Sequence, residues 1–194
     1  MITGMSKRPY QMARRAQSRD ETRARIVAAA IALHEELGPK ATTISAIAER
    51  AGVQRLTVYR HFPDDASLFE ACSSGWYEDN PFPDFAALEG IGRHGCREAL
   101  AALYRYYGTT RGMWASVLRD APDMPVLAAP NERYRAFLAG LSAMLIERLT
   151  PPLSRKDFAS ATVDHAVRFA TWQSLEEAGL GDEAKADLVM GWLE

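Results

Sequence analysis

Apolar residues recur every three or four positions along most of this 194-residue chain, which is the spacing of one buried face of an α-helix. The pattern first appears after Ser18, where Ser18 and Glu21 are spaced to satisfy each other's free backbone N–H groups as a capping box. It predicts a helix over 18–37, ended by a Gly-Pro pair. Residues 1–17 lack this periodicity and are predicted to form a basic, mobile arm.

Two shorter helical patterns follow, and a glycine separates them. Thr42 or Thr43 can cap the first pattern, and the second covers about 54–61. Gly52 suits the tight turn between them, because glycine adopts positive φ without steric cost. Two short helices joined in this way predict a helix-turn-helix, whose second helix enters the major groove of DNA.

The proline-rich residues 80–84 form the clearest boundary in the chain. One helix is predicted before this boundary, over 64–77. Helical periodicity continues after it and predicts helices over 95–108, 111–120, 131–149, 154–178 and 182–193. No segment alternates with the two-residue period of a strand, so the predicted fold class is all-α. The predicted division is an arm at 1–17, a helix-turn-helix DNA-binding domain at 18–63 and a larger helical domain at 64–194.

Charge is distributed unevenly, although the net charge is only −2. Residues 1–62 carry 11 basic and 5 acidic residues, which is a net charge of +6. The remainder carries 12 basic and 20 acidic residues, which is a net charge of −8. A basic end on an acidic body favours a polyanionic partner at that end only.

The cysteines and histidines offer no chemistry of their own. Cys72 and Cys96 lie far apart, which is typical of a reduced, intracellular protein, and no apolar run is long enough to span a membrane. The four histidines are scattered, without a metal-binding or catalytic motif. The sequence predicts a cytoplasmic protein that is not an enzyme, with no metal, no cofactor and no membrane partner.

The segment 54–61 carries the side chains that a DNA-reading helix needs. Arg55 can donate two hydrogen bonds to guanine, Gln54 can pair with adenine, and Thr57 can bond a base or pack on a thymine methyl group. The residues suited to the phosphate backbone are Tyr59, Arg60 and His61. The arginines that can lie along an adjacent groove, by analogy with a homeodomain arm, are Arg14, Arg15 and Arg19. The alternative is a solvated helix with ordinary surface charges.

This region resembles the TetR family of bacterial transcriptional regulators. The similarity covers about 25–72 and rests on Thr42-Thr43-Ile44, Ile47-Ala48-Glu49, Ala51-Gly52-Val53, the run from Thr57 to Phe62, and Leu68. The resemblance implies DNA contacts by Thr43, Gln54, Arg55, Thr57, Tyr59 and His61. Two positions depart from the family pattern: Ser45 replaces a frequent arginine, and Asp65, beside Asp64, replaces a lysine that touches phosphate. Both changes predict weaker non-specific affinity, for which Arg60 and the N-terminal arginines can compensate.

The resemblance also implies that the larger domain holds a small molecule and forms a dimer. The residues expected to line the ligand cavity are Trp76, Tyr104, Tyr107, Met113, Trp114, Phe137, His165, Arg168, Phe169 and Trp172. Of these, His165 and Arg168 can orient a polar group of an apolar ligand. Each aromatic side chain can equally belong to a plain core. The last two predicted helices, 154–178 and 182–193, are expected to pair with those of a second copy.

Together these features predict a homodimeric repressor that releases a palindromic operator when it binds a small apolar or aromatic molecule. One alternative keeps the fold but lacks sequence-specific DNA reading and acts through protein partners. The other is a small helical enzyme that uses the aromatic cavity.

Overall fold

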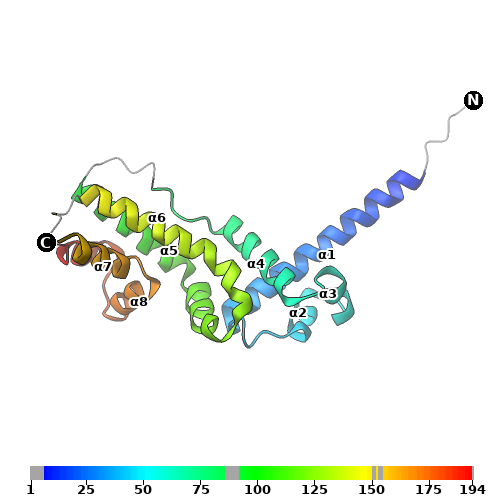
Figure 1. Ribbon diagram of the computed structural model, residues 1–194. Helices are drawn as coiled ribbons and strands as arrows, with labels where there is room; N and C mark the ends of the chain where they lie inside the picture. The colour runs from blue at the N-terminus through cyan, green and yellow to red at the C-terminus, as the bar shows by residue number, and fades with distance from the viewer. Residues whose placement is uncertain (1–6, 86–91, 150–151, 153–154, 194) are drawn as a thin grey trace, which may run out of the picture.

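A computed structural model describes residues 7–85, 92–149, 152 and 155–193, and the regular elements in these ranges are helices without a strand. The all-α prediction is therefore confirmed for the part of the chain that the structure describes. Figure 1 shows an elongated molecule, with α1 projecting at one end, α2, α3 and α4 in the middle, and α5, α6, α7 and α8 at the other end.

The helices form two packed units, which we call the head and the body. The head contains α1 (Lys7–Leu37), α2 (Ile44–Ala51), α3 (Arg55–His61) and the start of α4 (Asp65–Asp79). The body contains the rest of α4, α5 (Arg93–Asp120), η1 (Ala121–Asp123), η2 (Pro125–Leu127), α6 (Ala128–Leu149), α7 (Lys156–Ala166), α8 (Phe169–Glu177) and α9 (Asp182–Gly191).

The head is held by a small apolar core and by helix caps. Ile26 of α1 and Val58 of α3 are fully buried in this core. Thr43 caps α2, because its hydroxyl oxygen accepts the backbone N–H of Ala46 at 3.1 Å. Gly52 ends α2 in the left-handed conformation, with φ of 64°, as the sequence predicted for the turn.

The body is built around α5, against which α6, α8 and α9 pack. Tyr104, Tyr107 and Trp172 are almost completely buried at its centre. The Lys185 side chain is also buried, where it pairs with Asp182 and Glu176 and lies 5.1 Å from the centre of the Trp172 ring. These pairings satisfy a charge that would otherwise be costly to bury.

The prediction that the first helix begins at Ser18 is wrong, because α1 already begins at Lys7. Ser18 lies inside the helix, and its carbonyl accepts the hydroxyl of Thr22. The residues between Pro9 and Ser18 include neither glycine nor proline and are mostly good helix formers, so they extend the helix without an apolar face. The basic arm at 1–17 is thus helical from Lys7 onward.

The predicted break between 108 and 111 is also absent, since α5 runs continuously from Arg93 to Asp120. Gly112 lies where α1 approaches closely, since a Cβ atom there would lie 2.9 Å from Glu35, whereas one on Gly108 would make an ordinary contact with Asp182 at 3.7 Å. The packing of α1, α8 and α9 along α5 therefore outweighs the low helix propensity of the two glycines.

The single helix predicted over 154–178 is interrupted between α7 and α8. The hydroxyls of Tyr104 and Tyr107 donate to the carbonyls of Ala166 and Val167, at 2.9 and 2.7 Å. These side-chain bonds satisfy carbonyl groups that a continuous helix would have used internally. The break therefore depends on residues of α5 that are distant in the sequence.

Candidate nucleic-acid interface and internal cavity

One side of α3 is locked into the head and the other is open to solvent. Val58 is fully buried, so it fixes the rotation of this short helix. The exposed residues at and after its start include the predicted base readers Gln54 and Arg55. Thr57 is half-buried, and its side chain lies at the edge of the exposed face. The structure thus brings the three predicted readers together on an accessible helix.

The residues predicted to contact phosphate lie at the end of α3. Tyr59 and Arg60 are exposed, and His61 is half-buried. Thr43 is exposed at the start of α2, where its hydroxyl also caps that helix. The sequence reasoning missed Leu56, which is 57% exposed between the readers. Leu56 does not share the helix face of the apolar residues Val53 and Val58, and this difference marks it as a surface residue. An apolar side chain there can contact a thymine methyl group.

Arginines of α1 lie beside the end of α3. The Arg23 guanidinium stands over the Phe62 ring, 4.3 Å from its centre. Burial lowers the pKa of His61, and the charges of Arg19 and Arg23 lower it further. The positive potential of α1 therefore continues to the C-terminal end of the candidate reading helix.

The acidic residues after α3 have different positions. Asp64 caps α4, since its carboxylate accepts the Ser67 backbone N–H at 2.7 Å, and this bond lowers the pKa of Asp64. Asp65 is exposed in the first turn of α4. Asp64, the acid beside the departure at Asp65, thus has a structural use, because a carboxylate stabilises the start of a helix.

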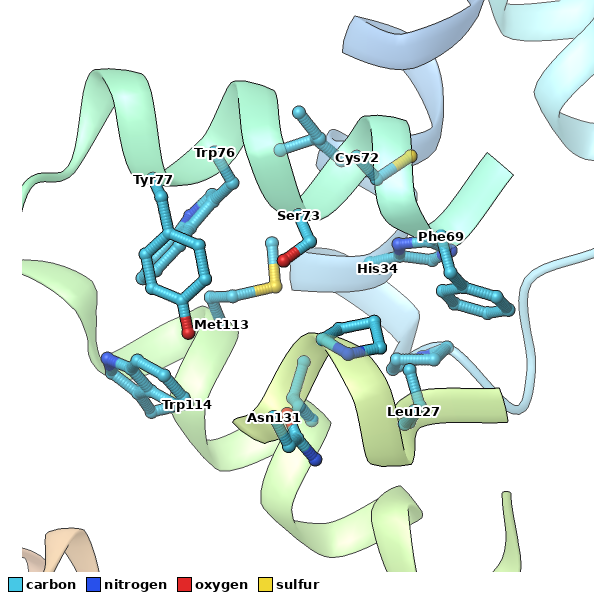
Figure 2. Close-up of a pocket in the computed structure, with 14 residues that line it drawn as sticks. His34, Phe69, Cys72, Ser73, Trp76, Tyr77, Met113, Trp114, Leu127 and Asn131 are labelled. Carbon is cyan, nitrogen blue, oxygen red and sulfur yellow. The ribbon is translucent and has the colours of Figure 1, made fainter. Parts of the chain in front are cut away.

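An internal cavity lies where the head meets the body. Its lining includes Cys72 of the head core and Trp76, Met113 and Trp114 of the body core. Figure 2 shows the side chains of Ser73, Trp76 and Tyr77 pointing from α4 toward α5. About 50 Å³ of this space is open to the centre of a water molecule. The enclosed space is therefore limited, so a molecule of the size of an aromatic ring has to widen it.

The cavity is apolar and uncharged, with a few polar groups. His34 of α1 is 5% exposed and stacks on Phe69 with 5.0 Å between the ring centres. Burial lowers the pKa of His34 to about 4, so the imidazole is neutral at neutral pH. Ser73 and Asn131 supply a hydroxyl and an amide to the same lining. Such a site favours an uncharged molecule that can exchange a hydrogen bond.

Only part of the predicted ligand-binding set lines this cavity. Trp76, Met113 and Trp114 do so, while the core residues away from it are Tyr104, Tyr107, Phe137, Phe169 and Trp172. His165 and Arg168 are exposed on either side of the break between α7 and α8. The expected grouping is wrong for these two residues, because the break separates them from the aromatic face they were expected to share. The sequence did not predict that His34 lines the cavity, because no residue near it in the sequence indicates that it is buried against α4.

A polar contact joins the head to the body next to the cavity. Asp120, at the end of α5, accepts the Lys40 backbone N–H at 3.0 Å and the Arg119 side chain at 2.8 Å. The Arg119 guanidinium also donates to the Leu37 carbonyl, and the Ser116 hydroxyl donates to the Glu35 carbonyl. We call these bonds the α5 clasp. It holds the end of α1 to the helix that supplies Met113 and Trp114 to the cavity.

The described residues include no cluster of three or more metal-ligating side chains. Among the same residues, no helix combines the length and apolar character that crossing a membrane requires.

Comparisons with known proteins agree with this division of the molecule. Residues 26–72 match the family model of bacterial regulatory proteins of the tetR family. The fold is similar to that of a TetR-like transcriptional regulator from Rhodococcus sp. RHA1, with a TM-score of 0.65, 19% identity, and coverage of 89% of this chain and 93% of that one. A second transcriptional regulator from Rhodococcus sp. RHA1 has a TM-score of 0.61 at 19% identity, covering 88% of this chain and 95% of the other. GusR from Salmonella enterica has a TM-score of 0.60 at 22% identity, covering 89% and 95%. No curated protein matches the sequence.

Proposed function

We propose that this chain is a ligand-responsive, homodimeric repressor of the TetR family, since residues 26–72 match the family's N-terminal domain and the fold is similar to that of TetR-like transcriptional regulators. The observation that carries the proposal is the two-sided character of α3. Val58 anchors the helix in the head, while Gln54 and Arg55 remain exposed. This arrangement suits a helix that enters the major groove.

In this proposal the exposed side chains divide the work of binding DNA. Gln54, Arg55 and Thr57 read base edges, with Arg55 bonding guanine through two N–H groups. The groups that hold the phosphate backbone are Thr43, Tyr59, Arg60 and His61. The base contacts give sequence preference, whereas the phosphate contacts give affinity and its salt dependence.

The effector occupies the cavity between head and body. The apolar lining and the neutral His34 favour a small uncharged aromatic or apolar molecule with one hydrogen-bonding group. Binding of such a molecule widens the space between α4 and α5, and the α5 clasp transmits that movement to α1. The effector can shift the equilibrium only by its difference in affinity for the two arrangements.

Dimerisation through the C-terminal helices places two heads on one operator. Phe158 of α7 is 72% exposed, and Leu188 and Trp192 at α9 are 43% and 41% exposed. Large apolar side chains at such positions favour burial against a second copy. A two-fold dimer then requires a palindromic site whose halves lie a whole number of DNA turns apart.

The proposal is tested by selecting a DNA sequence from a random pool and measuring its affinity by fluorescence anisotropy. Arg55→Ala should weaken binding to the selected palindrome by about 1–3 kcal/mol and relax the preference at one base pair. The control Arg111→Ala removes an exposed arginine of the body and should leave the affinity unchanged. Unchanged affinity and base preference in Arg55→Ala would refute its role as a reader.

Effector binding needs a separate test. Ser73→Phe fills the cavity with a larger side chain, so it should keep DNA binding but abolish release by small uncharged aromatic compounds such as phenol or indole. The same compounds should change the fluorescence of the wild-type protein, because Trp76 and Trp114 line the cavity. Release that persists unchanged in Ser73→Phe would place the effector elsewhere.

A further inference from the structure

The first half of α1 is a basic helix whose described side chains are exposed to solvent. From Tyr10 to Glu21 every residue is exposed, and the first buried residue of α1 is Ile26. Figure 1 shows this part of α1 extending away from α2, α3 and α4. Residues 7–25 carry seven basic and two acidic residues, a net charge of +5. We call residues 7–25 the basic extension.

Most residues of the basic extension are good helix formers, but the extension lacks the apolar packing that stabilises most protein helices. A helix without an apolar face gains no stability from packing, and short isolated helices are marginal in water. Arg15, Arg19 and Arg23 follow one another at four-residue spacing, so like charges are neighbours on the helix surface. A polyanion that neutralises these charges would stabilise the helix and be bound by it.

The position of the basic extension indicates which polyanion it meets. Arg23 stacks on Phe62, and Arg19 lies close enough to His61 to lower its pKa, so the basic residues begin where the candidate reading helix ends. From there the helix leads outward, and residues 7–18 add about 18 Å at 1.5 Å per residue. That length corresponds to about five base pairs at 3.4 Å per step.

We propose that the basic extension is a second DNA contact, which binds the phosphate backbone flanking the bases that α3 reads. This inference rests on the proposed DNA binding by α3, since it needs the head to be seated on a duplex. The extension contributes affinity and length of footprint but no base preference, because phosphate contacts carry no sequence information. An anionic membrane is a poorer partner, since a helix that lies on a membrane needs an apolar face, and the exposed large apolar residues among the described side chains of residues 10–25 are only Tyr10 and Met12.

The test compares two duplexes that share the selected palindrome, one ending at its edges and one with ten additional base pairs of random sequence on each side. The variant is Arg14→Ala with Arg15→Ala and Arg19→Ala. Wild type should bind the long duplex more tightly than the short one, and the variant should lose most of that difference. On the long duplex, the slope of log K against log salt concentration should fall by about 0.9 for each phosphate that the variant no longer neutralises, or about 3 for each head.

Two control variants separate charge from folding. Replacing the same arginines by lysine keeps the charge, so affinity for the long duplex and the salt slope should stay close to the wild-type values. Replacing three exposed basic residues of α5 and α6, Arg105, Arg111 and Arg135, by alanine removes the same charge away from the proposed dimer helices and should change neither measurement. Circular dichroism of the wild type should show increased helicity on the long duplex and a smaller increase in the alanine variant.

The possible failures are distinguishable. If the alanine variant keeps the wild-type salt slope and length dependence while Arg55→Ala weakens binding, the basic extension is not a DNA contact but the proposed function stands. Equal losses on the two duplexes would place the contact within the palindrome and overturn the flanking contact. If neither duplex binds the wild type, both proposals fail. Binding to phosphatidylserine-containing vesicles that disappears in the variant, with DNA binding unchanged, would assign the extension to membranes and overturn the inference.

Discussion

The α5 clasp depends on one buried carboxylate, and its removal gives a sharp prediction. Asp120 is 5% exposed and accepts the backbone N–H of Lys40, a residue of the head. Asp120→Ala deletes this acceptor and leaves the N–H group without its partner. We expect the head to be held less firmly against the body and the whole chain to be less stable.

The magnitude follows from the hydrogen bonds that the substitution removes. A hydrogen bond to a charged group contributes about 1.5–3 kcal/mol, and a partly buried N–H group left unsatisfied adds to the loss. The second partner, Arg119, is 59% exposed in its side chain, so its ion pair with Asp120 adds little in water. Asp120→Ala should therefore reduce the free energy of unfolding by about 2 kcal/mol.

Asp123 provides the matched control, because it also contacts Lys40 but from the surface. Its carboxylate lies 2.5 Å from the Lys40 ammonium, and the two side chains are 64% and 60% exposed. Asp123→Ala should leave stability almost unchanged, since exposed ion pairs contribute little. Both variants are measured by urea unfolding at one fixed protein concentration, because the proposed dimerisation would make stability depend on concentration. If Asp120→Ala is no less stable than Asp123→Ala, the reasoning is refuted.

The clasp also predicts the sign of a pH effect. The hydrogen bond from Arg119 is the main cause that lowers the pKa of Asp120 in the folded state, and the Lys40 N–H lowers it as well. The contribution of Asp120 is therefore complete above the unfolded pKa of about 4 and is lost as the pH falls through the lower folded pKa. The stability difference between wild type and Asp120→Ala should shrink over that acidic range. A difference that grows on acidification would contradict this assignment.

Four further predictions follow from other parts of the structure. Burial lowers the pKa of His34 to about 4, so the contribution of the neutral imidazole to the free energy of unfolding should be complete above pH 6.5. The free energy of unfolding should fall by up to about 3 kcal/mol as the pH drops toward 4. His34→Phe should flatten this pH dependence in urea titrations. Burial raises the pKa of the Cys72 thiol to about 12, so a thiol reagent should label it only after unfolding, and rapid labelling of the native protein would show that the head opens. Thr43→Ala removes the cap of α2 and should lower the melting temperature by an amount equivalent to about 1 kcal/mol, whereas Thr43→Ser should not. Gly38→Ala should reduce thermal stability more than Gly52→Ala, although both glycines have positive φ. A Cβ atom on Gly38 would lie 2.5 Å from the Asp120 carboxylate, whereas the atom nearest to a Cβ on Gly52 is 4.0 Å away. Equal losses in thermal unfolding would refute the steric argument.

The sequence determined the head with little help from long-range contacts. Its features are local: a hydroxyl before α2, a glycine in the turn and an apolar residue on the inner side of α3 each act within a few residues. Cap bonds and positive φ are properties of short segments, which is why the roles of Thr43 and Gly52 could be predicted. The exposed positions of Gln54 and Arg55 followed from the same short-range pattern.

The tertiary structure decided the ends and breaks of the longer helices. Gly108 and Gly112 resemble helix breakers in isolation, but other helices pack along α5, and Glu35 approaches Gly112 closely. The break after Ala166 is stabilised by a tyrosine hydroxyl from α5, which no local pattern in that segment announces. Such effects depend on residues that are tens of positions apart, so they cannot be derived from propensity alone.

The sequence by itself therefore determined the fold class, the helix-turn-helix and the exposed side chains of the candidate reading helix, because these depend on short-range periodicity and on the chemistry of single side chains. Only the tertiary structure decided which aromatic residues surround the cavity. Trp76 and Trp114 line it, whereas Tyr104 and Tyr107 are used to bond the chain at the break before α8. An apolar helix face looks the same in the sequence whether it meets a cavity or another helix, and only packing distinguishes the two.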